Sequence, residues 1–161
     1  MLRGLLVILC ACSAAPVRTA NPHGVESWEV IGKRLPGRWI ATTDGATVPV
    51  EFRFVARDSV LLETFGNPGR ETVTTYHADG KSMVATHYCA QGNQPRLRMQ
   101  SGDAHHPHLA LADVTGQDAG ESVLVELAFD LTAETGFERV EVYRQPGGKL
   151  ERTVWKFAPA P

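Results

Sequence analysis

The feature that most constrains this chain is a long series of short segments in which apolar and polar residues alternate. Residues 48–57 show the pattern clearly, because Val48, Val50, Phe52 and Phe54 fall on one face of an extended strand. About ten such segments follow one another at the 8–12-residue spacing typical of all-β barrels and sandwiches. No long helical segments alternate with them, which argues against a parallel α/β sheet.

Tight connections between these segments favour antiparallel neighbours, and Asp79-Gly80 is the strongest hairpin signal among them. One helix is expected before the strands, because Trp28, Ile31 and Leu35 recur at helical spacing. We therefore predict an all-β fold over residues 25–158. The predicted architecture is a single closed up-and-down antiparallel β-barrel of about eight to ten strands with a short N-terminal helix.

Residues 1–20 have the pattern of a secretory signal. Arg3 precedes an apolar run that is far shorter than the ~20 residues needed to span a bilayer. Two processing sites remain open: a lipobox-like segment in which Cys12 would be lipidated, and ordinary cleavage after Ala14. We expect an exported protein that is periplasmic, lipid-anchored in the outer membrane, or secreted. Cys89 is then the one thiol left in the domain, which excludes an internal disulfide.

Charge and composition exclude further classes. The 16 Lys and Arg residues nearly balance the 18 Asp and Glu residues, and the net charge of -2 argues against a nucleic-acid partner. A hydrophobic fraction of 43% is too high for a disordered chain. The length of 161 residues suits one domain with a core of its own.

Gly37-Arg38-Trp39 follows the expected helix and opens the first strand. This segment resembles the Gly-x-Trp signature of lipocalins and the wider calycin group. The resemblance implies a ligand-binding type of barrel, in which the tryptophan packs at the closed end beneath a basic side chain from a late strand. Trp39 would take that structural place here, with Arg144 or Arg152 as the basic side chain.

A second resemblance centres on Thr86-His87-Tyr88-Cys89 and on residues 92–96, Gly-Asn-Gln-Pro-Arg. These residues are similar to a segment of small uncharacterised exported bacterial proteins with a calycin-like barrel. The order of the strands extends the resemblance over most of the mature chain. It implies a ligand-binding type of fold but no particular activity, since a fold alone does not determine function.

The hairpin around Asp79-Gly80 determines which of these side chains share a face. With those two residues in the loop, Tyr76 lies opposite Met83. Because side chains alternate along a strand, Met83, His87 and Cys89 then lie on the same face as Tyr76. We predict that this face points into the barrel.

The predicted ligand-binding set combines interior side chains with polar groups at the barrel mouth: Tyr76, His87, Cys89, Asn93, Gln94 and Arg96. A neutral imidazole beside a thiol can orient a ligand carbonyl. Catalysis by the pair is disfavoured, because such neighbours lie about 6.5–7 Å apart, whereas proton transfer needs about 2.6–3.2 Å. Each functional prediction has a structural alternative. His87 and Cys89 would be a core histidine and a small buried cysteine, Asn93 and Gln94 would cap backbone groups of their loop, and Arg96 would be solvated.

His105, His106 and His108 suggest zinc or copper by composition, but a loop interrupted by Pro107 does not fix their geometry. No hydrolase, phosphate-binding, Cys-x-x-Cys or His-Glu-x-x-His motif is present in the sequence. We therefore predict neither a metal nor a cofactor. Haem binding through His87 is a weaker alternative, because one histidine lacks a second signature.

The sequence thus favours a small exported barrel that binds a hydrophobic or amphipathic small molecule in its interior. The alternative is a structural or interaction module of the cell envelope, with a barrel filled by its own side chains. Binding is favoured over enzymatic activity, although a barrel can host isomerase or hydrolase chemistry without a linear motif. We expect membrane contact only through a lipid anchor, and the sequence does not indicate an oligomeric state.

Overall fold

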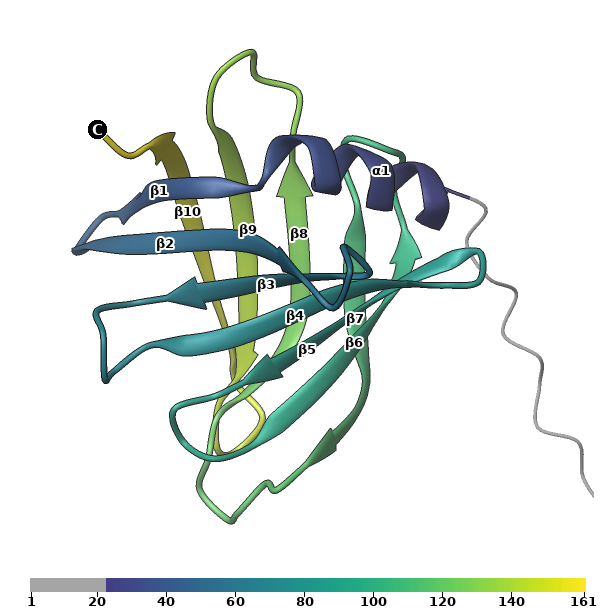
Figure 1. Cartoon of the computed structure of the whole chain (residues 1–161). Coiled ribbons are helices and arrows are strands. Elements are labelled where there is room, and N and C mark those ends of the chain that lie inside the picture. The colour runs from purple at the N-terminus through teal and green to yellow at the C-terminus, as the bar shows by residue number, and fades with distance from the viewer. Residues whose placement is uncertain (1–22) are drawn as a thin grey trace, which may run out of the picture.

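Ten strands and one helix form the part of the chain that the computed structural model describes, residues 23–161 (Figure 1). The predicted signal and Cys12, one of the two predicted processing sites, lie outside these residues. In chain order the elements are α1 (Gly24–Arg34), β1 (Gly37–Thr43), β2 (Ala46–Val55), β3 (Val60–Phe65), β4 (Thr72–Asp79), β5 (Ser82–Tyr88), β6 (Gln94–Ser101), β7 (His108–Thr115), β8 (Val123–Asp130), β9 (Phe137–Arg144) and β10 (Leu150–Pro159).

The strands form a closed barrel in which each pairs in antiparallel fashion with its neighbours along the chain. β1 completes the circle, because Trp39 lies opposite Val50 of β2 on one side and Pro159 of β10 on the other. Closure pairs the two edges that an open sheet would expose. The predicted up-and-down antiparallel barrel with a short N-terminal helix is confirmed, with ten strands.

The barrel has a capped end and an open end. The capped end carries α1 and the β2–β3, β4–β5, β6–β7 and β8–β9 connections, and the other strand connections form the open end (Figure 1). Ser27 Oγ donates to the carbonyl of Asp103 at 3.0 Å, and Arg34 donates to the carbonyl of Gly136 at 3.0 Å. These two contacts tie α1 to two different connections and so hold it across the capped end.

α1 closes the barrel with its apolar side, on which Ile31 is fully buried and Trp28 meets Phe54 edge-on at 6.0 Å. Its first turn lies against the β4–β5 hairpin at Gly24. A Cβ atom at this glycine would lie 2.5 Å from the Cα atom of Ser82. Glycine is therefore the residue that permits this approach.

The β4–β5 hairpin differs from the prediction in its register. Its two-residue loop begins at Gly80 rather than Asp79, so Tyr76 lies opposite Ala85 rather than Met83. Gly80 has a φ of +58°, and a type II′ hairpin turn requires glycine at the first loop position. The difference moves each partner by two residues, which leaves every side chain on its predicted face.

The capped half of the barrel interior is filled by aromatic and aliphatic side chains. Phe137 stacks on Phe157 with their ring centroids 4.1 Å apart, and Phe52 meets Phe137 edge-on at 6.1 Å. Trp39 joins this group and donates its indole N–H to the carbonyl of Leu35 at 2.7 Å. Close packing of aromatic rings therefore fills much of this half of the interior.

The arginines expected above Trp39 lie elsewhere. Arg144 ends β9 and Arg152 lies near the start of β10, so both belong to the open end, whereas Trp39 lies opposite Pro159 at the other end of β10. That expectation is corrected, because the antiparallel register separates these residues along the barrel axis. The indole ring packs instead against Phe137, with centroids 5.0 Å apart.

Candidate functional site

The open half of the barrel interior holds buried charged groups. Arg139 and Glu141 share the inward face of β9 with Phe137, because side chains alternate along a strand. Arg139 Nη1 contacts Glu63 Oε1 of β3 at 2.5 Å, and its Nη2 contacts Glu141 Oε1 at 2.7 Å. One guanidinium therefore bridges two carboxylates inside the barrel.

Further contacts complete much of this charged cluster of Glu63, Arg139 and Glu141. The Tyr76 hydroxyl donates to Glu63 Oε2 at 2.6 Å, and Trp155 Nε1 donates to Glu141 Oε2 at 3.3 Å. The guanidinium also lies over two phenylalanine rings, 4.9 and 5.1 Å from their centroids. Within residues 23–161, Arg139 Nε has no hydrogen-bond partner.

Burial and the neighbouring charges control ionisation in the charged cluster. Burial raises the pKa of Glu141, and Arg139 counteracts only part of that rise. Burial alone would lower the pKa of Arg139, but the charges of Glu63 and Glu141 raise it above its ordinary value. Burial, with a contribution from the Glu63 charge, also raises the pKa of Tyr76, so this phenol remains a hydrogen-bond donor.

His87 lies beside the charged cluster with both ring nitrogens near hydroxyl groups. Its Nδ1 is 2.9 Å from Thr74 Oγ1, and its Nε2 is 3.4 Å from the Tyr143 hydroxyl. Burial lowers the pKa of His87 to about 4, although the charge of Glu63 acts in the opposite direction. The imidazole is therefore neutral at neutral pH and offers one donor and one acceptor.

A cavity of about 140 Å³ adjoins the charged cluster and His87. Its walls combine charged or polar groups with apolar ones: Glu63, Thr72, Thr74, Tyr76, His87, Arg139, Glu141 and Tyr143, and Phe65, Leu124 and Leu127. An apolar cavity of ~150 Å³ is known to accept benzene. The space is therefore comparable to a molecule of about six non-hydrogen atoms.

Two of the predicted ligand-binding residues, Tyr76 and His87, lie on the hairpin face that the structure turns inward. Met83 on this face is fully buried, and Tyr76 and His87 line the cavity. Cys89 follows the end of β5 at the open end and is partly exposed. It is not among the residues that line the cavity.

The other three predicted residues are not brought to the cavity. Asn93 Nδ2 donates to Glu121 at 2.9 Å and so links the β5–β6 and β7–β8 connections. Gln94 donates to a backbone carbonyl within its own loop. Arg96 forms an exposed ion pair with Asp113 at 2.6 Å, because the alternation of β6 turns it outward. These contacts match the structural alternatives for the three residues.

The charged cluster and Tyr143 were not predicted from the sequence. A signal for them was present in β9, where Arg139, Glu141 and Tyr143 alternate with Val140 and Val142. This alternation places the polar residues on one face, and a polar face is normally the solvent-exposed one. The ion pair between Arg139 and Glu63, on a strand far away in the sequence, shows that this polar face is the inner one.

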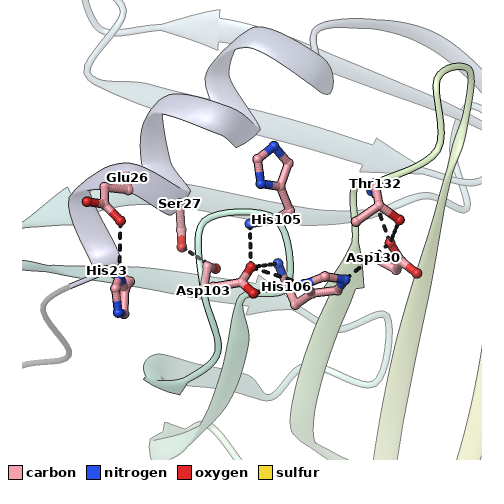
Figure 2. Close-up of polar contacts among 8 residues, drawn as sticks. All are labelled: His23, Glu26, Ser27, Asp103, His105, His106, Asp130 and Thr132. Carbon is pink, nitrogen blue, oxygen red and sulfur yellow. Dashed lines mark hydrogen bonds and ion pairs between the residues drawn. The ribbon is translucent and has the colours of Figure 1, made fainter.

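The histidines at the capped end do not converge on one point. His106 Nδ1 lies 3.0 Å from Asp103 and its Nε2 lies 3.6 Å from Asp130 (Figure 2). His105 contacts Asp103 through its backbone N–H, whereas His108 faces Glu126. Within the described range, 23–161, no group of three or more His, Cys, Asp or Glu residues is placed to hold a metal ion.

Comparison with known proteins adds no family to this picture. No protein-family model matches the chain, and no curated protein matches it. No helix within residues 23–161 has the length and hydrophobicity to cross a membrane.

Proposed function

We propose that this barrel binds a compact amphipathic small molecule in its interior cavity. The observation that carries the proposal is the combination of a cavity of about 140 Å³ with walls that contain both polar and apolar side chains. Small-molecule sites characteristically join an apolar lining to a few placed polar groups. In this barrel Phe65, Leu124 and Leu127 would contact the apolar part of the ligand, and the hydroxyl groups beside His87 would orient its polar group.

The size of the cavity limits the ligand. Sites for drug-sized molecules occupy about 300–1,000 Å³, which is at least twice the volume of this cavity, about 140 Å³. Haem ligation by His87 is disfavoured for the same reason, and because Thr74 and Tyr143 already lie against both ring nitrogens. The ligand would be a small molecule rather than a long lipid chain or a macrocycle.

The contacts of His87 favour binding over catalysis. Its ring nitrogens face the Thr74 and Tyr143 hydroxyls, and burial raises the pKa of Tyr143 well above its ordinary value. Burial also keeps the imidazole neutral down to a pH of about 4. A pair of this kind donates and accepts hydrogen bonds at fixed positions, which suits recognition of a polar group.

Export completes the proposal. The signal-like residues 1–20 would direct the protein to the periplasm, to the outer membrane through lipid on Cys12, or to the medium. The intact mass of the mature protein and its Cys12→Ala variant distinguishes these outcomes. Lipidation predicts an added acyl mass and membrane fractionation that the variant loses. Retention of residues 1–20 in the mature protein would contradict export.

Native mass spectrometry of protein purified from its source cells tests ligand binding. We expect a bound small molecule that is lost on denaturation. A Leu124→Phe variant should abolish the added mass, because the larger ring would fill the cavity that Leu124 lines. Leu150→Phe is the matched control, since Leu150 is 58% exposed and lies outside the cavity. A ligand-free wild-type protein that also fails to bind any compact amphiphile would overturn the proposal.

The filled capped half favours a second candidate, a structural or interaction module of the cell envelope without a ligand. Phe52, Phe129 and Phe157 are all buried there, as such a barrel would require. The same measurement separates the two functions. A structural module predicts that Leu124→Phe raises the melting temperature by filling empty space and changes no binding.

A further inference from the structure

The open half of the interior contains more acidic than basic charge. Glu63 and Glu141 contribute two carboxyl groups, Arg139 contributes one guanidinium, and the neutral His87 contributes no charge. The titratable groups that line the cavity are Glu63, Tyr76, His87, Arg139, Glu141 and Tyr143. With both carboxyl groups ionised, this set carries one uncompensated negative charge. A buried charge of this kind is costly unless a partner balances it.

We propose that the cavity selects compact cationic amphiphiles, above all primary alkylamines, over neutral and anionic molecules of the same size. This inference rests on the proposed function and adds the charge of the ligand to it. An ammonium group would supply the missing positive charge within the barrel wall. Its alkyl part would lie against Phe65, Leu124 and Leu127.

The carboxylates retain the capacity to hold such a group. Each of the four oxygen atoms of Glu63 and Glu141 has one donor in the structure: two from Arg139, one from Tyr76 and one from Trp155. A carboxylate offers about four lone-pair sites, so about half of the acceptor sites of each group stay free. An ammonium group has three donors and no acceptor, which suits this set of acceptors.

The unliganded protein would balance its excess charge with a proton. Burial raises the pKa of Glu141, which favours the protonated form of this carboxyl group in the absence of a ligand. An ammonium ligand would favour the ionised carboxylate and displace the proton into solvent. Amine binding would then release protons, whereas binding of a neutral alcohol would release none.

Three probes of similar size test the inference on the wild-type protein: n-butylamine, 1-butanol and butyrate. Isothermal titration calorimetry at pH 7.5 would give each affinity, and NMR shifts of the His87 ring would locate the site. We expect n-butylamine to bind at least about tenfold more tightly than 1-butanol, which corresponds to ~1.4 kcal/mol, with butyrate weakest. Titrations in two buffers of different ionisation enthalpy should show proton release for the amine only.

A pair of variants checks the origin of the preference. Glu141→Gln should reduce the amine-to-alcohol ratio to less than about threefold, because it leaves Glu63 and Arg139 balanced. Glu126→Gln, which changes an outward carboxylate that faces His108, should leave the ratio unchanged. The wild-type comparison keeps the test decisive if Glu141→Gln fails to fold.

The outcomes separate the two proposals. Equal binding of amine and alcohol, or tighter binding of butyrate, would overturn the preference for cations and leave ligand binding intact. An amine preference that persists in folded Glu141→Gln would overturn the role of the excess charge. Failure of all three probes to shift the His87 resonances at tens of millimolar would overturn the proposed function for compact amphiphiles.

Discussion

The two halves of the barrel interior are built by the same alternating strands and hold very different contents. In the capped half, Phe52, Phe137 and Phe157 pack ring against ring beneath α1. In the open half, the next inward positions of β3 and β9 carry Glu63 and Arg139, with a cavity beside them. One strand, β9, contributes to both halves within three residues.

This difference shows how a small barrel can combine a stable core with a site. The aromatic half needs only burial and close packing, and each ring contributes to stability independently of charge. The stability of the polar half depends on its ion pairs, because each buried charge requires a partner of opposite charge. Substitutions in the two halves should therefore have different consequences for stability.

The largest effect is expected from breaking the charged cluster at its centre. Arg139→Met leaves Glu63 and Glu141 buried without a cation, and should reduce the free energy of unfolding by about 5 kcal/mol at pH 7, the upper part of the range for broken buried pairs. Urea denaturation measures the loss. The triple variant that combines Arg139→Met with Glu63→Gln and Glu141→Gln should recover most of the lost free energy of unfolding. A single variant as stable as wild type would show that the cluster is not a mutually dependent unit.

The aromatic half should respond more strongly to truncation than the half with the cavity. Phe52→Ala should cost about 4 kcal/mol, because its ring is surrounded by other rings and only 1% exposed. Phe65→Ala should cost about half as much, since Phe65 is only partly buried and already borders open space. Urea denaturation of the two variants compares the halves directly. Equal losses would contradict the contrast between a filled half and a hollow one.

Acid should destabilise the protein through His87. The folded-state pKa of about 4 lies below the unfolded value of about 6.5, so the unfolded chain binds more protons between these values. The contribution of His87 to the free energy of unfolding is fully present above pH 6.5, and about 3 kcal/mol of it is lost as the pH drops through 4. Measuring the free energy of unfolding from pH 7.5 to 4 in wild type and His87→Asn isolates this slope.

Glu141 acts in the opposite sense in that experiment. Its pKa is raised on folding, so its contribution to stability falls as the pH rises from the unfolded value towards the folded one. The difference between wild type and His87→Asn removes this effect, because both proteins contain Glu141. A difference that does not change with pH would mean that His87 titrates alike in the folded and unfolded states.

The fold could be predicted from the sequence because alternation is a local property. Val50 and Phe52 sit inside the barrel as their pattern required, and Gly80 ensured a hairpin even though the loop lies one residue further along than expected. The inward face of β5 was likewise predictable, because Met83 and Ala85 gave it an apolar character. These features depend on neighbours within a few residues.

The charged cluster depends on residues far apart in the chain and could not be predicted in the same way. Glu63 and Arg139 are 76 positions apart, and each alone has the appearance of an exposed residue on an alternating strand. Arg96 shows the converse error: it was expected at the mouth of the site and pairs outward with Asp113. Only the closed register decides which polar face is internal.

The smallest effect concerns how α1 is held over the filled half. Gly24→Ala places a methyl group 2.5 Å from Ser82 Cα, where only backbone movement can make room, and should cost about 1–3 kcal/mol. Gly45→Ala is the matched control at the open end, because a Cβ atom there meets nothing within 4 Å. Thermal unfolding compares the two variants. If α1 is an essential lid on the core, Gly24→Ala should also increase hydrogen exchange at Ile31, and an unchanged exchange rate would mean that the strands hold the capped half together without it.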